Sequence, residues 1–252
     1  MLSSNLIKEL ASLKQKKYRN EYGKFLIEGF HLVEECLRSA YELEYIILRE
    51  GTDLQGKDAI LEMISQNKTI VEPLPEKLFS KLVETEASQG IIGVVKKIPQ
   101  LNNKSGNIII ALDKISDPGN MGTIIRTAWW FGVKDIWLSE DCADPYNSKV
   151  IRSTQGGIFH VNIREDLDLR SHLLASAKNG YKVYLFTLDA ENRLNDIAET
   201  NNSILVFGNE AHGISGEILS CGFDKVKING FSDCESLNAA ISAGIALYHF
   251  KR

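Results

Sequence analysis

The segment Ile108–Arg126 has the sequence IIIALDKISDPGNMGTIIR. It opens with Ile108–Leu112, an apolar run that is typical of a strand buried on both faces of a parallel sheet. Asp-Pro-Gly-Asn at residues 117–120 indicates a turn, and the residues after it predict a helix over Gly122–Phe131. The segment therefore predicts a strand, a turn and a helix whose free backbone N–H groups favour an anion.

Further short apolar runs alternate with helical segments up to the C-terminus. We predict helices around Leu169–Ala177 and over Ser236–Phe250, and strands at Ile136–Leu138, Val183–Phe186, Ile204–Phe207 and Val226–Ile228. Short apolar strands that alternate with helices predict a parallel sheet covered on both faces. We therefore expect an α/β domain over residues 107–252.

The first 98 residues carry the same alternation on a smaller scale. Apolar spacing predicts strands at Tyr45–Leu48 and Ile91–Val95 and helices over residues 5–17, 30–40 and 59–64. Residues 99–106 are polar and rich in loop formers, which is typical of a linker. The chain is therefore expected to form a smaller α/β domain over 1–98, a linker over 99–106 and the larger domain after it.

Composition excludes several classes of protein. The 252 residues are 44% hydrophobic and 25% charged, which argues against a mainly disordered chain. No apolar run approaches the roughly 18 residues of a membrane helix, and the polar N-terminus does not resemble a secretory signal. The four cysteines form no CxxC pair, which predicts neither a zinc site nor disulfides. These observations predict a cytoplasmic protein without a membrane segment or a bound metal.

The charges are unevenly distributed. A net charge of −4 does not indicate a nucleic-acid binder, which often has a basic domain. Between Lys8 and Lys24, however, cations outnumber acidic residues, and Tyr18 and Tyr22 stand among them. Such a stretch either binds phosphates and stacks bases or forms a solvated helix face.

Two further loops follow predicted strands of the larger domain. Residues 208–215 read GNEAHGIS, and residues 229–238 read NGFSDCESLN. Ligands of parallel sheets bind outside the carboxyl ends of the strands, so we expect these loops and segment 113–126 to form one site. Each also fits a plainer interpretation, with Arg126 on the surface, His212 structural and Ser236 a helix N-cap.

Several common catalytic motifs are absent from the sequence. No GxGxxG follows a predicted strand, and no Walker A, HExxH or GxSxG motif is found. The sequence therefore does not predict a Rossmann dinucleotide site, an ordinary class I methyltransferase loop, a zinc protease or a serine hydrolase.

Three motifs together resemble the SpoU (TrmH-like) RNA ribose 2′-O-methyltransferases of the SPOUT superfamily. Residues 117–132 are similar to DPGNxGxIxRTAxxFG, and Val206–Gly213 is similar to a hydrophobic pair followed by GNExxG. Ile228 and Ser236–Asn238 match part of the third motif, IPM followed by SLN. In the N-terminal part, residues 24–35 and 88–95 resemble the L30e-like substrate-binding domain of many members.

This resemblance implies a fold, a cofactor and partners. It implies a deep trefoil knot in the C-terminal domain and S-adenosylmethionine as the methyl donor. It also implies an RNA substrate, with the N-terminal domain favouring 23S ribosomal RNA, and a homodimer in which the last helix lies at the interface. The small residues at 239–244 permit a close helix approach, either in a dimer or inside the core.

Candidate site residues follow from the motif positions and from the basic stretches. The predicted catalytic residues are Arg126, Asn120, Glu210, Ser236 and Asn238. The predicted cofactor contacts are Thr187, Gly208, Asn209, Ile228 and Leu237. The predicted RNA contacts are Lys14, Lys17, Arg19, Lys149 and Arg152. The resemblance makes Arg126 the base, whereas a guanidinium gives up its proton only with great difficulty, which favours stabilisation of the oxyanion or a phosphate clamp.

The third motif departs from the family pattern. Asn229 and Gly230 replace its proline and methionine, and Ala239 and Ala240 replace its valines. If the replaced side chains contact the cofactor in the family, their loss weakens cofactor binding. A second hypothesis is therefore an inactive RNA-binding protein of ribosome assembly. A tRNA 2′-O-methyltransferase is a further alternative. Calorimetry with S-adenosylmethionine separates the enzyme from the binder.

We predict that Arg126→Ala abolishes methyl transfer while S-adenosylmethionine binding stays nearly intact. The reason is that this guanidinium acts on the ribose oxygen or its phosphate and not on the methyl donor. A methyl-transfer assay and calorimetry on the same preparation measure both quantities. Normal turnover by the variant on the correct RNA contradicts the assignment.

Overall fold

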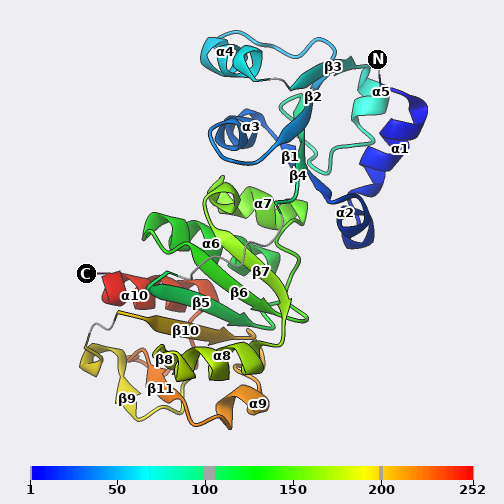
Figure 1. Cartoon of the computed structure of the whole chain (residues 1–252). Helices are drawn as coiled ribbons and strands as arrows, with labels where there is room; N and C mark the ends of the chain where they lie inside the picture. The colour runs from blue at the N-terminus through cyan, green and yellow to red at the C-terminus, as the bar shows by residue number, and fades with distance from the viewer. Residues whose placement is uncertain (1, 68, 99–105, 199–200, 252) are drawn as a thin grey trace. The chain divides into compact units, whose positions relative to one another are not determined.

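The computed structural model describes the chain except residues 1, 68, 99–105, 199–200 and 252. Contacts divide the described residues into two compact units (Figure 1). The first lies within Met1–Pro99 and Asp144–Phe159, and the second within Gln100–Ala143 and His160–Arg252. The linker predicted at 99–106 lies, except for Gly106, outside the described residues.

The N-terminal unit is built on a four-stranded sheet in the order β1-β4-β2-β3. Its strands are β1 (Lys24–Glu28), β2 (Leu43–Arg49), β3 (Ile70–Leu74) and β4 (Ile91–Lys96). β4 pairs antiparallel with both β1 and β2, and β3 runs parallel to β2. Pro73 lies inside β3, where an edge strand tolerates the missing N–H.

Helices pack around this sheet: α1 (Ser4–Ser12), α2 (Lys16–Tyr22), α3 (Phe30–Leu37), α4 (Asp58–Gln66) and α5 (Glu76–Phe79). The single helix predicted over 5–17 is wrong, because the chain forms α1 and α2 there. Gln15 has extended backbone angles and interrupts the helical path. Leu10 and Leu13, on the predicted apolar face, are buried as expected.

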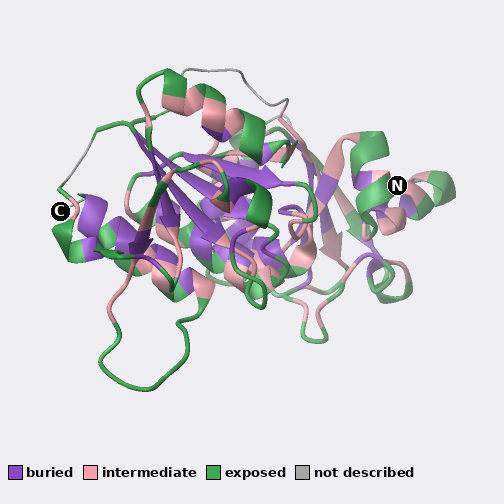
Figure 2. Ribbon diagram, turned by 90° about the horizontal axis from the view of Figure 1, so that it is seen from below, coloured by how far each residue is buried: buried purple, intermediate pink, exposed green. Residues whose placement is uncertain are grey.

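The second unit contains a seven-stranded sheet in the order β7-β6-β5-β10-β8-β11-β9. All its strand pairs are parallel, which confirms the predicted sheet class. The strands are β5 (Ile108–Asp113), β6 (Asp135–Ser139), β7 (Asn162–Leu167), β8 (Lys182–Phe186), β9 (Asn192–Arg193), β10 (Ser203–Gly208) and β11 (Asp224–Lys227). β5 and β10 are almost entirely buried (Figure 2).

Helices cover both faces of this sheet. α8 (Leu169–Lys178) and α9 (Gly216–Leu219) pack on one face, where Leu173 and Ile218 join strand residues in one apolar cluster. α6 (Pro118–Trp130) and α10 (Ala239–Lys251) pack against one another, and α10 also contacts β10. Within the residues that the structure describes, no helix is long and apolar enough to cross a membrane.

The chain order reverses between β10, the central strand of the sheet, and its neighbour β5. On one side of this point β5 is followed by β6 and β7, and on the other side β10 is followed by β8, β11 and β9. Such a switch point opens a crevice at the carboxyl ends of the strands. The loops after β5, β10 and β11, which the sequence proposes as one site, start at this edge.

Two helix starts differ from prediction, and both lie at this edge. α6 begins at Pro118 and not at Gly122, because proline suits the first helical position and Asp117 caps the helix. α10 begins at Ala239 and not at Ser236. The cap is Asn238, whose Oδ1 accepts hydrogen bonds from the backbone N–H groups of Ala240 and Ile241.

Candidate active site

Glu210 is the centre of the polar contacts at this edge. Its Oε2 accepts hydrogen bonds from the backbone N and the Oγ of Ser116, both at 3.2 Å. Its Oε1 accepts hydrogen bonds from the backbone N of Asp117 at 3.2 Å and from Asn120 Nδ2 at 2.9 Å. One carboxylate from the β10 loop therefore holds the whole turn between β5 and α6.

This environment favours the charged form of Glu210. Partial burial alone raises the pKa of a carboxyl group, but the hydrogen bonds from Asn120 and from backbone N–H groups outweigh it and lower the pKa of Glu210. The folded pKa therefore lies below the unfolded one. The contribution of this carboxylate to the free energy of unfolding is complete above the ordinary pKa near 4.5. It is lost as the pH falls through the lowered pKa.

Asn120 connects this cluster to the third loop. Its Oδ1 accepts a hydrogen bond of 2.7 Å from Asn238 Nδ2. Since Asn238 also caps α10, the start of that helix is tied to the first turn of α6. The structure thus brings together Asn120, Glu210 and Asn238, one residue from each predicted loop.

The β10 loop is held closed by Asn209 and Gly208. Asn209 Oδ1 accepts hydrogen bonds from the backbone N of Ala211 and His212, and its Nδ2 donates to Lys114 O at 2.8 Å. A Cβ at Gly208 would lie 2.2 Å from the carbonyl carbon of Gly213, so only glycine fits. Asn209, predicted to contact the cofactor, uses its side chain to join the first two loops.

The predicted cofactor contacts after β8 and β11 lie on open loops. Nothing lies within 4 Å of a Cβ built on Gly230, and Leu237 is 48% exposed. The backbone N–H groups of Gly230 and Leu237 form no hydrogen bond within the described residues. Thr187 follows β8 and bonds Asp189, while Ile228 follows β11 directly.

Arg126 and Ser236 do not join the polar network. Both are exposed, and neither side chain forms a hydrogen bond or ion pair with the described part of the chain. Arg126 is on α6, about one and a half turns after Asn120. Its guanidinium is therefore open to a ligand. Glu210 bonds the turn before α6 and does not bond Arg126.

The cations predicted to bind RNA lie in the N-terminal unit, in four kinds of environment. Lys17 and Lys149 are exposed, whereas Lys14 donates to Val83 O at 2.8 Å. Arg152 is half-buried, and among the described residues its buried Nη1 has no hydrogen-bond partner. Arg19 is only 4% exposed and forms an ion pair with Asp144, so the prediction that it contacts RNA is not supported.

Sequence reasoning missed the groups that organise the loops. Asp113, a buried residue at the end of β5, accepts a hydrogen bond of 2.6 Å from the backbone N of Ser215. Ser116 offers both its N–H and its hydroxyl to Glu210. The position of Asp113, directly after an apolar strand, could have indicated its role. No feature of the sequence indicates the role of Ser116.

The fold and the site define a two-unit α/β protein with a ligand site at the switch point of its parallel sheet. Residues 107–248 match the model of the SpoU rRNA Methylase family, and residues 4–93 match the MRM3-like substrate binding domain. The chain belongs to the SpoU rRNA methylase family. It is an RNA methyltransferase that uses S-adenosylmethionine, as the resemblance in its motifs implied.

Similar proteins support this membership along the whole chain. The chain is 32% identical to the 23S rRNA (guanosine(2553)-2′-O)-methyltransferase RlmP of Bacillus subtilis over 97% of this chain and 95% of that protein. An AdoMet-bound rRNA methyltransferase from Sinorhizobium meliloti is 25% identical, with a TM-score of 0.84 over 99% of this chain and 95% of that one. The SpoU methyltransferase AviRb of Streptomyces viridochromogenes shares the fold, with 21% identity, a TM-score of 0.87, and coverage of 99% of this chain and 97% of that chain.

We predict that Asn120→Ala raises the pKa of Glu210, since Asn120 gives the strongest of the hydrogen bonds that lower it. An NMR titration of the Glu210 carboxyl carbon measures this pKa in both proteins. Thr123→Ala, on the exposed side of the same helix, is the matched control and leaves it unchanged. If the pKa of Glu210 is the same in the wild-type protein and in Asn120→Ala, the hydrogen-bond network around Glu210 is refuted.

Proposed function

We propose that the protein methylates a ribose 2′-hydroxyl of 23S ribosomal RNA. The observation that carries this proposal is similarity over 97% of the chain to the Bacillus subtilis 23S rRNA enzyme, together with an exposed Arg126 on α6, the helix whose first turn is bonded to Glu210. The guanosine that the relative modifies is the first position to examine. S-adenosylmethionine supplies a methyl group already activated by its positive sulfur.

In this proposal the chain contributes mainly positioning and charge. Holding the ribose oxygen in line at about 3–3.5 Å from the methyl carbon can contribute several kcal/mol. Arg126 stabilises negative charge on the ribose oxygen, or clamps the neighbouring phosphate, because a guanidinium carries a positive charge and several N–H donors. Asn120 and Asn238 shape the ribose side of the pocket, Glu210 fixes the loop, and Ser236 completes the site from the third loop.

The methyl donor would lie against the loops after β8, β10 and β11. Backbone groups of Gly208, Ile228 and Leu237 would contact it, and Thr187 would line its pocket. The free N–H groups and open space around Gly230 support this placement. Asn209 would act through the shape of its loop, because its side chain is already bonded.

RNA would contact both sequence domains. Residues 1–98 would form the substrate-binding domain and 107–252 the catalytic domain, with 99–106 as the linker. The exposed Lys17 and Lys149, together with the half-buried Arg152, are the cations that we assign to RNA phosphates.

The family fold also leads us to infer a trefoil knot in the catalytic domain and a homodimer through α10. The small residues of α10 serve the interior, since Ala240, Ala243 and Ala246 are buried. Its outer side instead exposes Ile241, Ile245 and Tyr248, at spacings of four and three residues along one helix face. Such an apolar stripe favours an interface between copies of the chain.

Two alternatives are less well supported. An inactive assembly protein is not favoured, because the loops that would hold the methyl donor remain open and polar and the relatives are named as enzymes. A tRNA target is not favoured either, since the N-terminal substrate-binding domain accompanies an rRNA-modifying relative. We also infer a cytoplasmic location, where ribosomal RNA is found.

We predict that ribose methylation is lost at one position of 23S rRNA in cells that lack this protein. Mapping of 2′-O-methyl groups in total RNA from cells with and without the gene measures it. Wild-type protein restores the mark, and the Arg126→Ala protein does not. A lost mark confined to tRNA, or no lost mark, contradicts the proposal.

We further predict that the protein sediments with about twice the mass of one chain and that Ile245→Glu converts it to a monomer. A charge placed in the centre of the apolar stripe opposes burial there. Ile70→Glu, at an exposed position of the N-terminal unit, is the matched control and leaves the dimer intact. A monomeric wild-type protein disproves the proposed interface.

A further inference from the structure

The segment Asp144–Phe159 lies inside the catalytic domain in sequence but belongs to the N-terminal unit in structure. The family model covers 107–248 without interruption, whereas contacts group this segment with Met1–Pro99. It contains α7 (Ser148–Thr154) and a short 3-10 helix, Gly157–Phe159. The chain therefore passes between the two units near residues 99, 143 and 159, and not through one linker alone.

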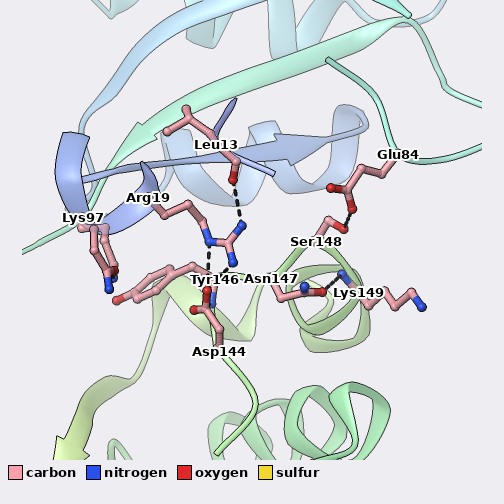
Figure 3. Close-up of polar contacts among 10 residues, drawn as sticks. Leu13, Arg19, Glu84, Lys97, Asp144, Tyr146, Asn147, Ser148 and Lys149 are labelled. Atoms are coloured by element: carbon pink, nitrogen blue, oxygen red, sulfur yellow. Dashed lines mark hydrogen bonds and ion pairs between the residues drawn. The ribbon is translucent and has the colours of Figure 1, made fainter. Parts of the chain in front are cut away.

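Arg19 holds the beginning of this segment. Its Nε donates to Asp144 Oδ2 at 2.9 Å, its Nη2 donates to the same oxygen, and its Nη1 donates to Leu13 O at 2.7 Å (Figure 3). The side chains are 5% and 9% exposed. Asp144 Oδ1 also accepts a hydrogen bond from the backbone N of Tyr146. One guanidinium thus joins α1, α2 and the turn that leads into α7.

Further contacts hold the segment along its length. The Tyr146 ring packs against Phe25 at 4.8 Å between centroids, and Lys97 Nζ lies 4.1 Å from the same ring. Ser148 Oγ donates to Glu84, and His31 approaches Gln155 O at 3.2 Å. These contacts make α7 a fixed part of the N-terminal unit.

Near the end of the segment, Gly156 allows a close approach to α3. It has a φ of +91°, and a Cβ added there would lie 2.6 Å from Glu35 Cγ. The 3-10 helix then places Phe159 edge-on to Tyr41 at 5.3 Å between ring centroids. The segment is therefore fixed at its far end as well.

Two of the cations assigned to RNA lie close in sequence to the Arg19–Asp144 pair. Lys17 is two residues before Arg19 on α2, and Lys149 is five residues after Asp144 on α7. In Figure 3 the Lys149 side chain extends away from the bonded cluster. We propose that Arg19 and Asp144 are positioning residues that hold the Lys17 and Lys149 helices in one body, so that both cations bind the same RNA. This inference rests on the proposed function.

Hydrogen bonds suit this positioning role because they are directional. A buried guanidinium bonded to a carboxylate and a carbonyl fixes both distance and angle between the two segments, which apolar contacts alone do less well. Two cations held in one rigid frame bind a polyanion without the ordering cost that independent segments carry. Loss of the pair should therefore weaken RNA binding without changing the pocket for the methyl donor.

The test compares Asp144→Asn and Arg19→Lys with the wild-type protein on large-subunit rRNA purified from cells that lack the protein. We expect the KM for this RNA to rise about tenfold, the size expected for the loss of one or two phosphate contacts, with unchanged kcat and unchanged S-adenosylmethionine affinity. Arg38→Met breaks an exposed ion pair of the same unit with Glu34 and should change none of these values.

A second measurement separates positioning from general stability. In the wild-type protein, Lys149→Ala should lower the slope of log affinity against log salt by about one. In the Asp144→Asn protein the same substitution should leave that slope nearly unchanged, because Lys149 is no longer held against the RNA. An equal change in both backgrounds, or an unchanged RNA KM in both pair variants, overturns the inference.

If a single variant does not fold, Arg19→Met/Asp144→Leu takes its place. No buried charge is left unpaired in it, so it should fold, and the same rise in RNA KM is expected. Wild-type levels of RNA binding by this folded protein also overturn the inference. Failure of the wild-type protein to methylate the rRNA would instead refute the proposed function.

Discussion

The Glu210 carboxylate is the group on which the candidate active site depends. It accepts hydrogen bonds from Ser116, Asp117 and Asn120, and it comes from a different strand than the turn that it holds. Asn120 in turn accepts a hydrogen bond from Asn238, so the start of α10 is held as well. Because these hydrogen bonds lower the pKa of Glu210, the network is charged and complete at neutral pH.

This arrangement explains why the site needs a parallel sheet with a switch point. β5 and β10 are neighbours with aligned carboxyl ends, so Asp113 stands opposite Gly208 in the register. The loops that leave them can therefore bond each other across a few ångströms. Arg126 stays outside the network and is exposed, which is the condition for the action on RNA that we propose for it.

Much of the fold and of the candidate site could be predicted from the sequence, for physical reasons that differ between residues. Apolar runs identify β5, β10 and their neighbours, since a strand buried on both faces must be apolar. The three loops were predicted from the ends of those strands. The helix start at Pro118 was not, because Asp-Pro-Gly-Asn suits a turn and a capped first helical turn equally well. The separate roles of Lys17 and Arg19 depend on the distant Asp144, which local spacing does not reveal.

The most direct test of the account is hydrogen exchange at the backbone amides of Ser116 and Asp117, measured by NMR in the wild-type protein and in Glu210→Gln. The account predicts that both amides exchange markedly faster in the variant, because a neutral amide accepts more weakly than a carboxylate and offers one oxygen instead of two. Methyl transfer should fall in the same variant. Unchanged exchange at both amides would contradict the central role of Glu210.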